Sequence, residues 1–156
     1  MEFRAIAAED VPALFYVRTR TRENTYTLEQ LARLGITEDG VLKKLSSSYK
    51  GWLCENNASV VGFCMADGDT GELWVIAVLP DFERKGIGKR LMALAEDWLW
   101  EIGCTRAWLT TDVDTTLRAY SFYRNRGWVD WKVEDGLRWM QLFAPKELST
   151  QAGQEP

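Results

Sequence analysis

A run of apolar residues in the middle of the chain, followed by a glycine-rich turn and a helical pattern, constrains the fold most. Residues 72–79 are almost continuously apolar, as expected of a central strand that is covered on both faces. Pro80 ends this strand because it removes a backbone donor. From Ile87 to residue 102 apolar residues recur at helical spacing, and Gly103 supplies the stop. We therefore expect a buried strand that leads through a turn into a helix packed on the sheet.

Turn and capping signals on either side of this unit predict further strands and helices. Short strands are expected at residues 2–6, 52–55, 59–66, 107–111, 128–134 and 137–143. Helices are expected after Pro12, after Thr27, after Thr37 and over residues 116–126. Thr27 and Gln30 fit a capping box, and Gly35 ends that helix. Residues 56–57 and 135–136 are typical of hairpin turns, so the strands that flank each turn should form antiparallel pairs.

The length and apolar content of the chain indicate one domain. A chain of 156 residues, 46% of them hydrophobic, can bury a core without metals or disulfides. We expect a single domain over residues 1–145 and a polar tail over residues 146–156. The longest apolar run, residues 73–79, is far shorter than the roughly 20 residues of a membrane span, so we expect a cytoplasmic protein with no membrane partner.

Charge and missing residue types exclude several classes of function. The formal charge of -4 argues against a nucleic-acid partner, which needs a basic face, and suits a cationic substrate better. The chain has no histidine, which excludes serine-histidine hydrolases and most transition-metal sites. Cys54, Cys64 and Cys104 show neither metal-ligand nor disulfide spacing, so we expect buried reduced thiols and no metal. Acid-base chemistry would therefore use carboxylates, tyrosine, lysine or water.

The turn after the buried strand has the features of an anion site. A turn that presents backbone N–H groups at the start of a helix binds anions, because those donors are unpaired and the helix dipole adds partial positive charge. Gly86 and Gly88 let phosphates approach the backbone closely. Four cations surround the same turn: Arg84, Lys85, Lys89 and Arg90. In an otherwise acidic protein they favour a polyphosphate ligand over a glycine turn on a solvated helix end.

Spacing separates this turn from two other phosphate-binding motifs. A P-loop requires glycine where this chain has Glu83, and Ser or Thr where it has Arg90, which excludes a normal nucleoside-triphosphate site. A dinucleotide fingerprint needs a small residue at the position of Leu91 and a strand-turn-helix unit early in the chain. That motif is therefore disfavoured as well.

Two segments resemble the motifs of the GCN5-related N-acetyltransferase (GNAT) family. Residues 78–91, VLPDFERKGIGKRL, resemble its coenzyme A motif, and residues 119–128, AYSFYRNRGW, resemble its second motif. The resemblance implies an α/β (α+β) fold with a mixed, mostly antiparallel sheet of six to seven strands, splayed at its centre, and about four helices. It also implies direct transfer of acetyl from acetyl-CoA to a primary amine of a small molecule or protein, and by analogy a homodimer. The alternative is a non-catalytic acyl-CoA-binding or sensor protein with the same fold.

The resemblance also implies where the coenzyme binds and which residues act. The coenzyme would contact Ile76, Ala77, Val78, Arg84, Lys85, Gly86, Ile87, Gly88, Lys89, Arg90, Thr116 and Tyr123. Tyr123 matches the tyrosine proposed to protonate the departing thiolate, and Glu72 matches the position of a catalytic glutamate in several members. Asp112, Asp114 and water are alternative bases. A backbone N–H at Val78 would polarise the thioester carbonyl.

The chain departs from the family pattern at two positions. Glu83 stands where the family usually has glutamine or arginine, and its charge would oppose phosphates unless it points away or pairs with Arg84 or Lys85. Thr116 stands where the family often has asparagine, whose hydrogen bonding a hydroxyl replaces only in part.

The acceptor site is expected in two segments that vary with substrate in the family. These are residues 18–45 and residues 128–139. Their aromatic and acidic side chains permit a cationic or aromatic amine without selecting one, and include Tyr26, Asp130, Trp131 and Glu134.

Overall fold

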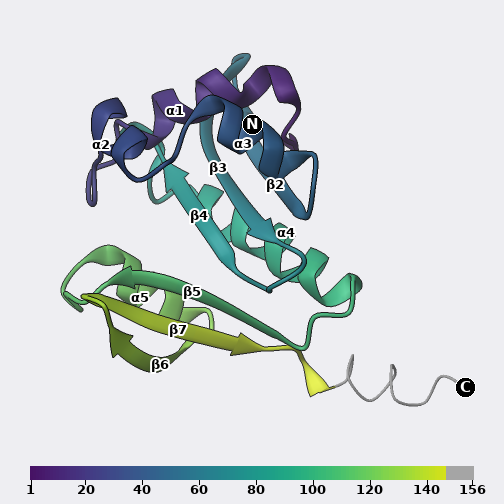
Figure 1. Cartoon of the computed structure of the whole chain (residues 1–156), viewed down its shortest axis with the longest axis vertical. Helices are drawn as coiled ribbons and strands as arrows, with labels where there is room; N and C mark the ends of the chain where they lie inside the picture. The colour runs from purple at the N-terminus through teal and green to yellow at the C-terminus, as the bar shows by residue number, and fades with distance from the viewer. Residues whose placement is uncertain (147–156) are drawn as a thin grey trace, which may run out of the picture.

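Two antiparallel sheets form the framework of the computed structural model, which describes residues 1–146 (Figure 1). The first sheet has the order β1-β2-β3-β4, with strands Glu2–Ala5, Tyr49–Asn56, Ser59–Asp67 and Leu73–Val78. The second has the order β5-β7-β6, with strands Arg106–Asp112, Leu137–Phe143 and Val129–Glu134. The expected polar tail, apart from its first residue, lies outside the described residues.

The two sheets meet where β4 begins. Glu72 and Trp108 form an isolated parallel bridge, and the backbone N–H of Trp108 donates to the carbonyl of Gly71 at 3.1 Å. The chains approach so closely there that a Cβ on Gly71 would lie 2.5 Å from the carbonyl oxygen of Arg106, and Gly71 itself has φ +80. Beyond this point β4 and β5 diverge toward their carboxyl ends (Figure 1). The expected splay between the central strands is confirmed.

Within residues 1–146, five α-helices and two 3-10 turns connect the strands. The helices are α1 (Val11–Arg18), α2 (Leu28–Arg33), α3 (Glu38–Leu45), α4 (Ile87–Glu101) and α5 (Arg118–Asn125), and the 3-10 turns are η1 (Ala8–Asp10) and η2 (Pro80–Phe82). Thr27 caps α2 through the expected capping box, in which its hydroxyl accepts from Gln30 N and Gln30 Oε1 accepts from Thr27 N. Thr37 caps α3 by accepting from Gly40 N at 3.1 Å. The fold class expected from the sequence is confirmed, with five α-helices among the described residues where about four were expected.

Helices cover both faces of the first sheet. On one face the buried side chains of α1 pack with alternate residues of β2 and β3, such as Leu53 and Phe63. On the other face α4 packs with the intervening residues, such as Trp52 and Cys64. This second core also includes Leu109 and residues of α5, so α4 supports both sheets.

A buried carboxylate ties α4 to the end of α5. Glu96 accepts two hydrogen bonds from the guanidinium of Arg126, at 2.6 and 3.1 Å, and one from the indole of Trp128 at 3.0 Å. The ring of Trp128 in turn packs against Tyr123, with ring centroids 6.2 Å apart. No local pattern in the sequence indicates this network, which holds Tyr123 in place relative to α4.

Two local expectations need correction. The first hairpin turns at Asn57 and Ala58, whose φ angles are 51 and 64, because β2 extends through Asn56. All three cysteines are free, as expected, but only Cys54 and Cys64 are buried, whereas Cys104 is partly exposed. Within residues 1–146 no group of three or more His, Cys, Asp or Glu is placed to hold a metal ion. No helix in that range is long and apolar enough to span a bilayer.

Candidate functional site

A cavity of about 1030 Å³ is lined by residues from both diverging strands. Its walls also include the glycine turn, α5 and the segment that follows α1. The expected site residues that line it are Glu72, Ile76, Ala77, Val78, Arg84, Gly86, Ile87, Gly88, Lys89 and Tyr123. Lys85, Arg90 and Thr116 are not among the lining residues. The splay therefore brings the glycine turn, β4 and Tyr123 to one space.

The glycine turn has a backbone suited to anions. Gly86 is the N-cap of α4 and has φ 81, in the left-handed region that favours glycine. Arg84 also has a positive φ of 60, which is uncommon for a residue with a side chain and typical of ligand sites. The fifteen residues of α4 direct the positive end of the helix dipole at this turn. The backbone of this turn and two of its cationic residues, Arg84 and Lys89, thus line the same cavity.

Glu83 is neutralised by two arginines from other elements. Its Oε2 lies 3.0 Å from Nε of Arg22 and also contacts Nη1 of Arg118. Glu23, beside Arg22, accepts the backbone N–H of Arg118 at 3.0 Å. Arg22 and Arg118, not the neighbours expected from the sequence, therefore compensate the charge of Glu83. The same contacts join the segment before α2 to the start of α5.

The register of β4 directs a backbone donor toward the cavity. The N–H of Leu79 donates to the carbonyl of Val61 on β3 at 2.9 Å, so it points toward β3. Because successive N–H groups of a strand point to opposite sides, the N–H of Val78 points away from β3, toward the diverging β5. Val78 lines the cavity. Its N–H therefore points to the side on which a ligand oxygen held between the strands would lie.

Tyr123 lies in the wall of the cavity with its ring packed against Phe122 and Trp128. Burial raises the pKa of its hydroxyl to about 12, and the positive charge of Arg18 opposes this shift. Among residues 1–146, the structure shows no hydrogen bond to this hydroxyl. Tyr123 is thus a protonated phenol that can donate to a ligand in the cavity.

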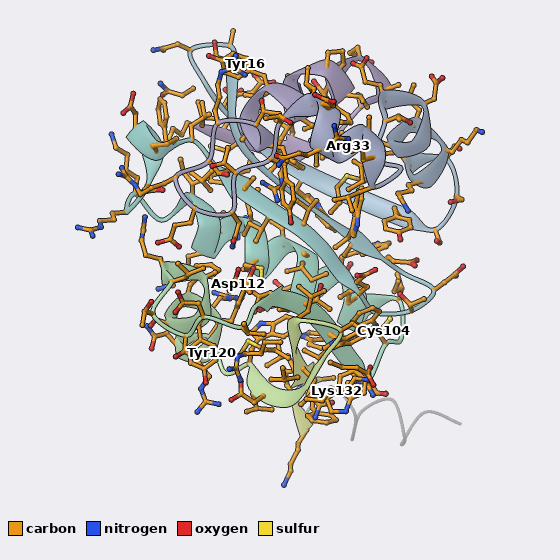
Figure 2. The ribbon with its side chains drawn as sticks, turned by 60° about the vertical axis from the view of Figure 1, so that its left-hand side comes forward. Tyr16, Arg33, Cys104, Asp112, Tyr120 and Lys132 are labelled. Atoms are coloured by element: carbon orange, nitrogen blue, oxygen red, sulfur yellow. The ribbon has the colours of Figure 1, made fainter. Side chains whose placement is uncertain are left out.

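Two of the candidate bases, Glu72 and Asp112, line the cavity. Glu72 lies at the junction of the sheets, where burial raises its pKa and the charge of Asp67 adds to the shift. Asp112 ends β5, and Figure 2 shows it between the second sheet and the rest of the molecule. Asp114 is exposed, and hydrogen bonds from Thr116 hold its pKa below the usual range. Glu72 and Asp112 therefore remain as candidate bases within the cavity.

Thr116 and most of the final hairpin point elsewhere. The backbone N–H and hydroxyl of Thr116 both donate to Oδ1 of Asp114, at 2.9 and 2.6 Å. Of the expected acceptor segment 128–139, only Leu137 lines the cavity, within the described residues. Trp131 packs edge-on against Trp139 at 5.8 Å, and Asp130 accepts from the Tyr120 hydroxyl at 3.0 Å.

The segment that follows α1 contributes much more to the cavity than the final hairpin does. The cavity is lined by Arg18, the last residue of α1, and by five residues of the segment after it: Thr21, Arg22, Glu23, Asn24 and Tyr26. This segment lies within the acceptor segment 18–45 expected from the sequence, in which Tyr26 was the residue named as a candidate. The spacing of Arg18 in the sequence could have indicated its place at the site. Arg18 lies one helical turn beyond the buried Leu14 and therefore shares its face of α1.

Comparisons with known proteins agree with this geometry. Residues 11–128 match the model of the acetyltransferase (GNAT) family. Over 64 residues, 41% of this chain, the sequence is 34% identical to mycothiol acetyltransferase from Pseudarthrobacter chlorophenolicus. The aligned part is 20% of that protein, so the chain spans about a fifth of the length of this relative.

Solved structures share the fold at low sequence identity. The PaiA N-acetyltransferase of Thermoplasma acidophilum, solved in complex with coenzyme A, superposes with a TM-score of 0.80 at 19% identity, over 92% of this chain and 100% of that one. The ribosomal-protein-S18-alanine N-acetyltransferase of Escherichia coli superposes with a TM-score of 0.71 at 19% identity, over 91% of this chain and 92% of that one.

Proposed function

Since the chain belongs to the acetyltransferase (GNAT) family, we propose that it transfers the acetyl group of acetyl-CoA directly to a primary amine. The observation that carries this proposal is the single cavity in which the glycine turn, the Val78 N–H, Tyr123 and Glu72 meet. Each of these groups supplies one requirement of the reaction.

The glycine turn would bind the phosphates of the coenzyme. Backbone donors at the start of α4, the helix dipole and the charges of Arg84 and Lys89 all favour an anion there. The pairing of Glu83 with Arg22 and Arg118 removes the repulsion that an unpaired carboxylate would cause. Between the splayed strands, the N–H of Val78 would donate to the thioester carbonyl oxygen, where negative charge develops during attack.

Proton transfer would involve Glu72 and Tyr123. As the amine nitrogen bonds to the carbonyl carbon and the carbon–sulfur bond breaks, the amine loses a proton and the thiolate gains one. Glu72, directly or through water, would accept the first proton, with Asp112 as the other carboxylate within the cavity. Tyr123 would donate the second, for which its protonated hydroxyl is suited. No covalent intermediate on the protein is needed.

The experiment that tests the proposal combines binding with turnover. Calorimetric titration should show micromolar or tighter binding of acetyl-CoA, with desulfo-CoA and ATP as comparison ligands. Thiol release should then be measured over a panel of primary amines. Binding without turnover of any amine would instead support a non-catalytic acyl-CoA-binding protein, and absence of binding would contradict the assignment of the glycine turn.

Tyr123→Phe separates catalysis from binding. We expect kcat to fall by roughly 100-fold or more, since general acid catalysis contributes about that much, while acetyl-CoA affinity stays the same. Tyr120→Phe is the matched control, because Tyr120 lies on the same helix but donates to Asp130 outside the cavity. Equal activity of the two variants would show that Tyr123 is not the acid.

A further inference from the structure

Arg18 is a half-buried cation in the cavity wall that has no carboxylate partner among the described residues. It ends α1, and burial lowers the pKa of its guanidinium, although such a group keeps its charge in a protein. Its Nη1 donates to the carbonyl of Asn24 at 2.9 Å, and its Cζ lies 4.6 Å from the centre of the Tyr26 ring. Within residues 1–146, no Asp or Glu lies within ion-pair distance of it.

Among the described residues, three other arginines that line the cavity differ from Arg18 in this respect, whereas Arg84 belongs to the glycine turn. Arg22 and Arg118 pair with Glu83, and Arg126 pairs with Glu96. A guanidinium has five N–H donors, and only one of those of Arg18 has a hydrogen-bond partner among the described residues. None of its nitrogens is sealed from solvent without a partner, so the remaining donors are accessible from the cavity.

The location of Arg18 argues against a role in binding the coenzyme phosphates. Arg18 lies on α1, which covers one face of the first sheet. The glycine turn begins α4, which covers the opposite face. Arg84 and Lys89 already supply cations at that turn. Arg18 and Tyr123 line the same cavity, and the positive charge of Arg18 opposes the rise in the pKa of the Tyr123 hydroxyl that burial causes. The unused donors of Arg18 therefore belong to the cavity that Tyr123 and Glu72 also line, while the glycine turn has cations of its own.

We propose that Arg18 binds a carboxylate of the acceptor, which makes the acceptor a small amino acid-like molecule with both a primary amine and a carboxylate. This inference rests on the acetyltransferase function proposed above and specifies its substrate. A planar guanidinium matches a carboxylate with two parallel hydrogen bonds, and a partly desolvated cation gains most from such a partner. The cavity also carries Glu72 and Asp112, so a zwitterion finds groups of opposite charge for each of its ends.

The test compares amino acids with their carboxamides as acceptors. The carboxamide keeps the amine and the side chain but lacks the negative charge. Its amine has a lower pKa, so a larger fraction of it is neutral and able to attack at neutral pH. Without a carboxylate site, the carboxamide should therefore be the better acceptor. The wild-type protein should nevertheless acetylate members of a panel of amino acids with a higher kcat/KM than their carboxamides. Preference for the carboxamides throughout the panel would overturn the proposal.

Variants assign this preference to Arg18. Arg18→Gln should lower the ratio of kcat/KM for acid over carboxamide about tenfold or more, mainly through KM, since a hydrogen bond to a charged group is worth that much. Arg18→Lys should retain part of the ratio, because it keeps the charge without the planar fork. Arg20→Gln is the control, since Arg20 stacks on Tyr16 at 3.7 Å, on the far side of the molecule from the second sheet (Figure 2). An unchanged ratio in Arg18→Gln, or a loss of acetyl-CoA affinity alone, would refute the assignment.

A binding measurement separates this inference from the proposed function. Amino acids are titrated calorimetrically into the wild-type and Arg18→Gln proteins saturated with CoA, where no transfer can occur. Binding to the wild type that is lost in Arg18→Gln supports the carboxylate site even if no amine is acetylated. If no amino acid binds to the wild type, the inference fails whether or not other amines are acetylated. Thermal unfolding with and without CoA checks that Arg18→Gln is folded.

Discussion

Replacement of Glu96 by alanine should destabilise the fold strongly, because it removes the acceptor of three hydrogen bonds at once. The side chains of Glu96 and Arg126 are 10% and 16% exposed, so the variant leaves a mostly buried guanidinium and the indole N–H of Trp128 without an acceptor. Breaking a buried ion pair costs about 3–5 kcal/mol, and the partial exposure places this one near 3 kcal/mol. For a chain of this size that loss lowers Tm by about 6–12 °C.

The assay is thermal and urea unfolding of Glu96→Ala beside a matched control. Glu101→Ala removes an exposed carboxylate from the same helix and should change the free energy of unfolding by no more than about 0.5 kcal/mol. Glu96→Gln keeps the shape and one acceptor oxygen, so its loss should lie between the two. If Glu96→Ala is within about 1 kcal/mol of Glu101→Ala, the network does not hold α5 to α4 as described.

Two further predictions concern the site itself. The kcat/KM should fall as the pH drops through the raised pKa of Glu72, above the ordinary glutamate range, and Glu72→Gln should abolish this acidic limb in a pH-rate profile. Tyr123, with a pKa of about 12, should cause no decline between about pH 7 and 10, and a basic limb that Tyr123→Phe removes would contradict its assignment. Gly88→Ala should unfold at the same or a higher temperature, because its Cβ meets the Phe122 ring at an ordinary 3.5 Å and alanine favours helices by up to about 1 kcal/mol. Calorimetry should nevertheless show at least tenfold weaker acetyl-CoA binding, and equal affinity would mean that phosphates do not approach the backbone at Gly88.

Local signals in the sequence predicted most of the fold. The capping box at Thr27, the stop at Gly35 and the apolar spacing of α4 each depend on residues within a few positions of one another, so they can be read without the tertiary structure. The first hairpin turn lies one residue beyond its predicted position. Asn56 and Asn57 both suit a turn, and only the pairing of β2 with β3 determines where the turn begins. Such choices depend on the partner strand.

The parts of the site that lie in short sequence motifs could be predicted. The contacts between side chains far apart in the sequence could not. The glycine turn and Tyr123 lie in short motifs, and the structure places them in one cavity. The partners of Glu83 come from residues 22 and 118, too far along the chain for any local pattern to indicate them. The homodimer, the cytoplasmic location and the identity of the acceptor stay predictions.

The splay of the sheets also gives the chain two internal strand edges. Past their junction at Glu72 and Trp108, β4 and β5 turn unpaired peptide groups toward each other, as the outward-pointing N–H of Val78 illustrates. Exposed strand edges are templates on which other polypeptides can add, and proteins commonly protect them with charges, bulges or covering elements. Here the two edges face each other across a shared opening, which limits access by a whole foreign strand while leaving room for a slender ligand. The same geometry that would admit a cofactor therefore also shields these two edges from pairing with another chain, whereas β1 and β6 form the outer edges of the two sheets.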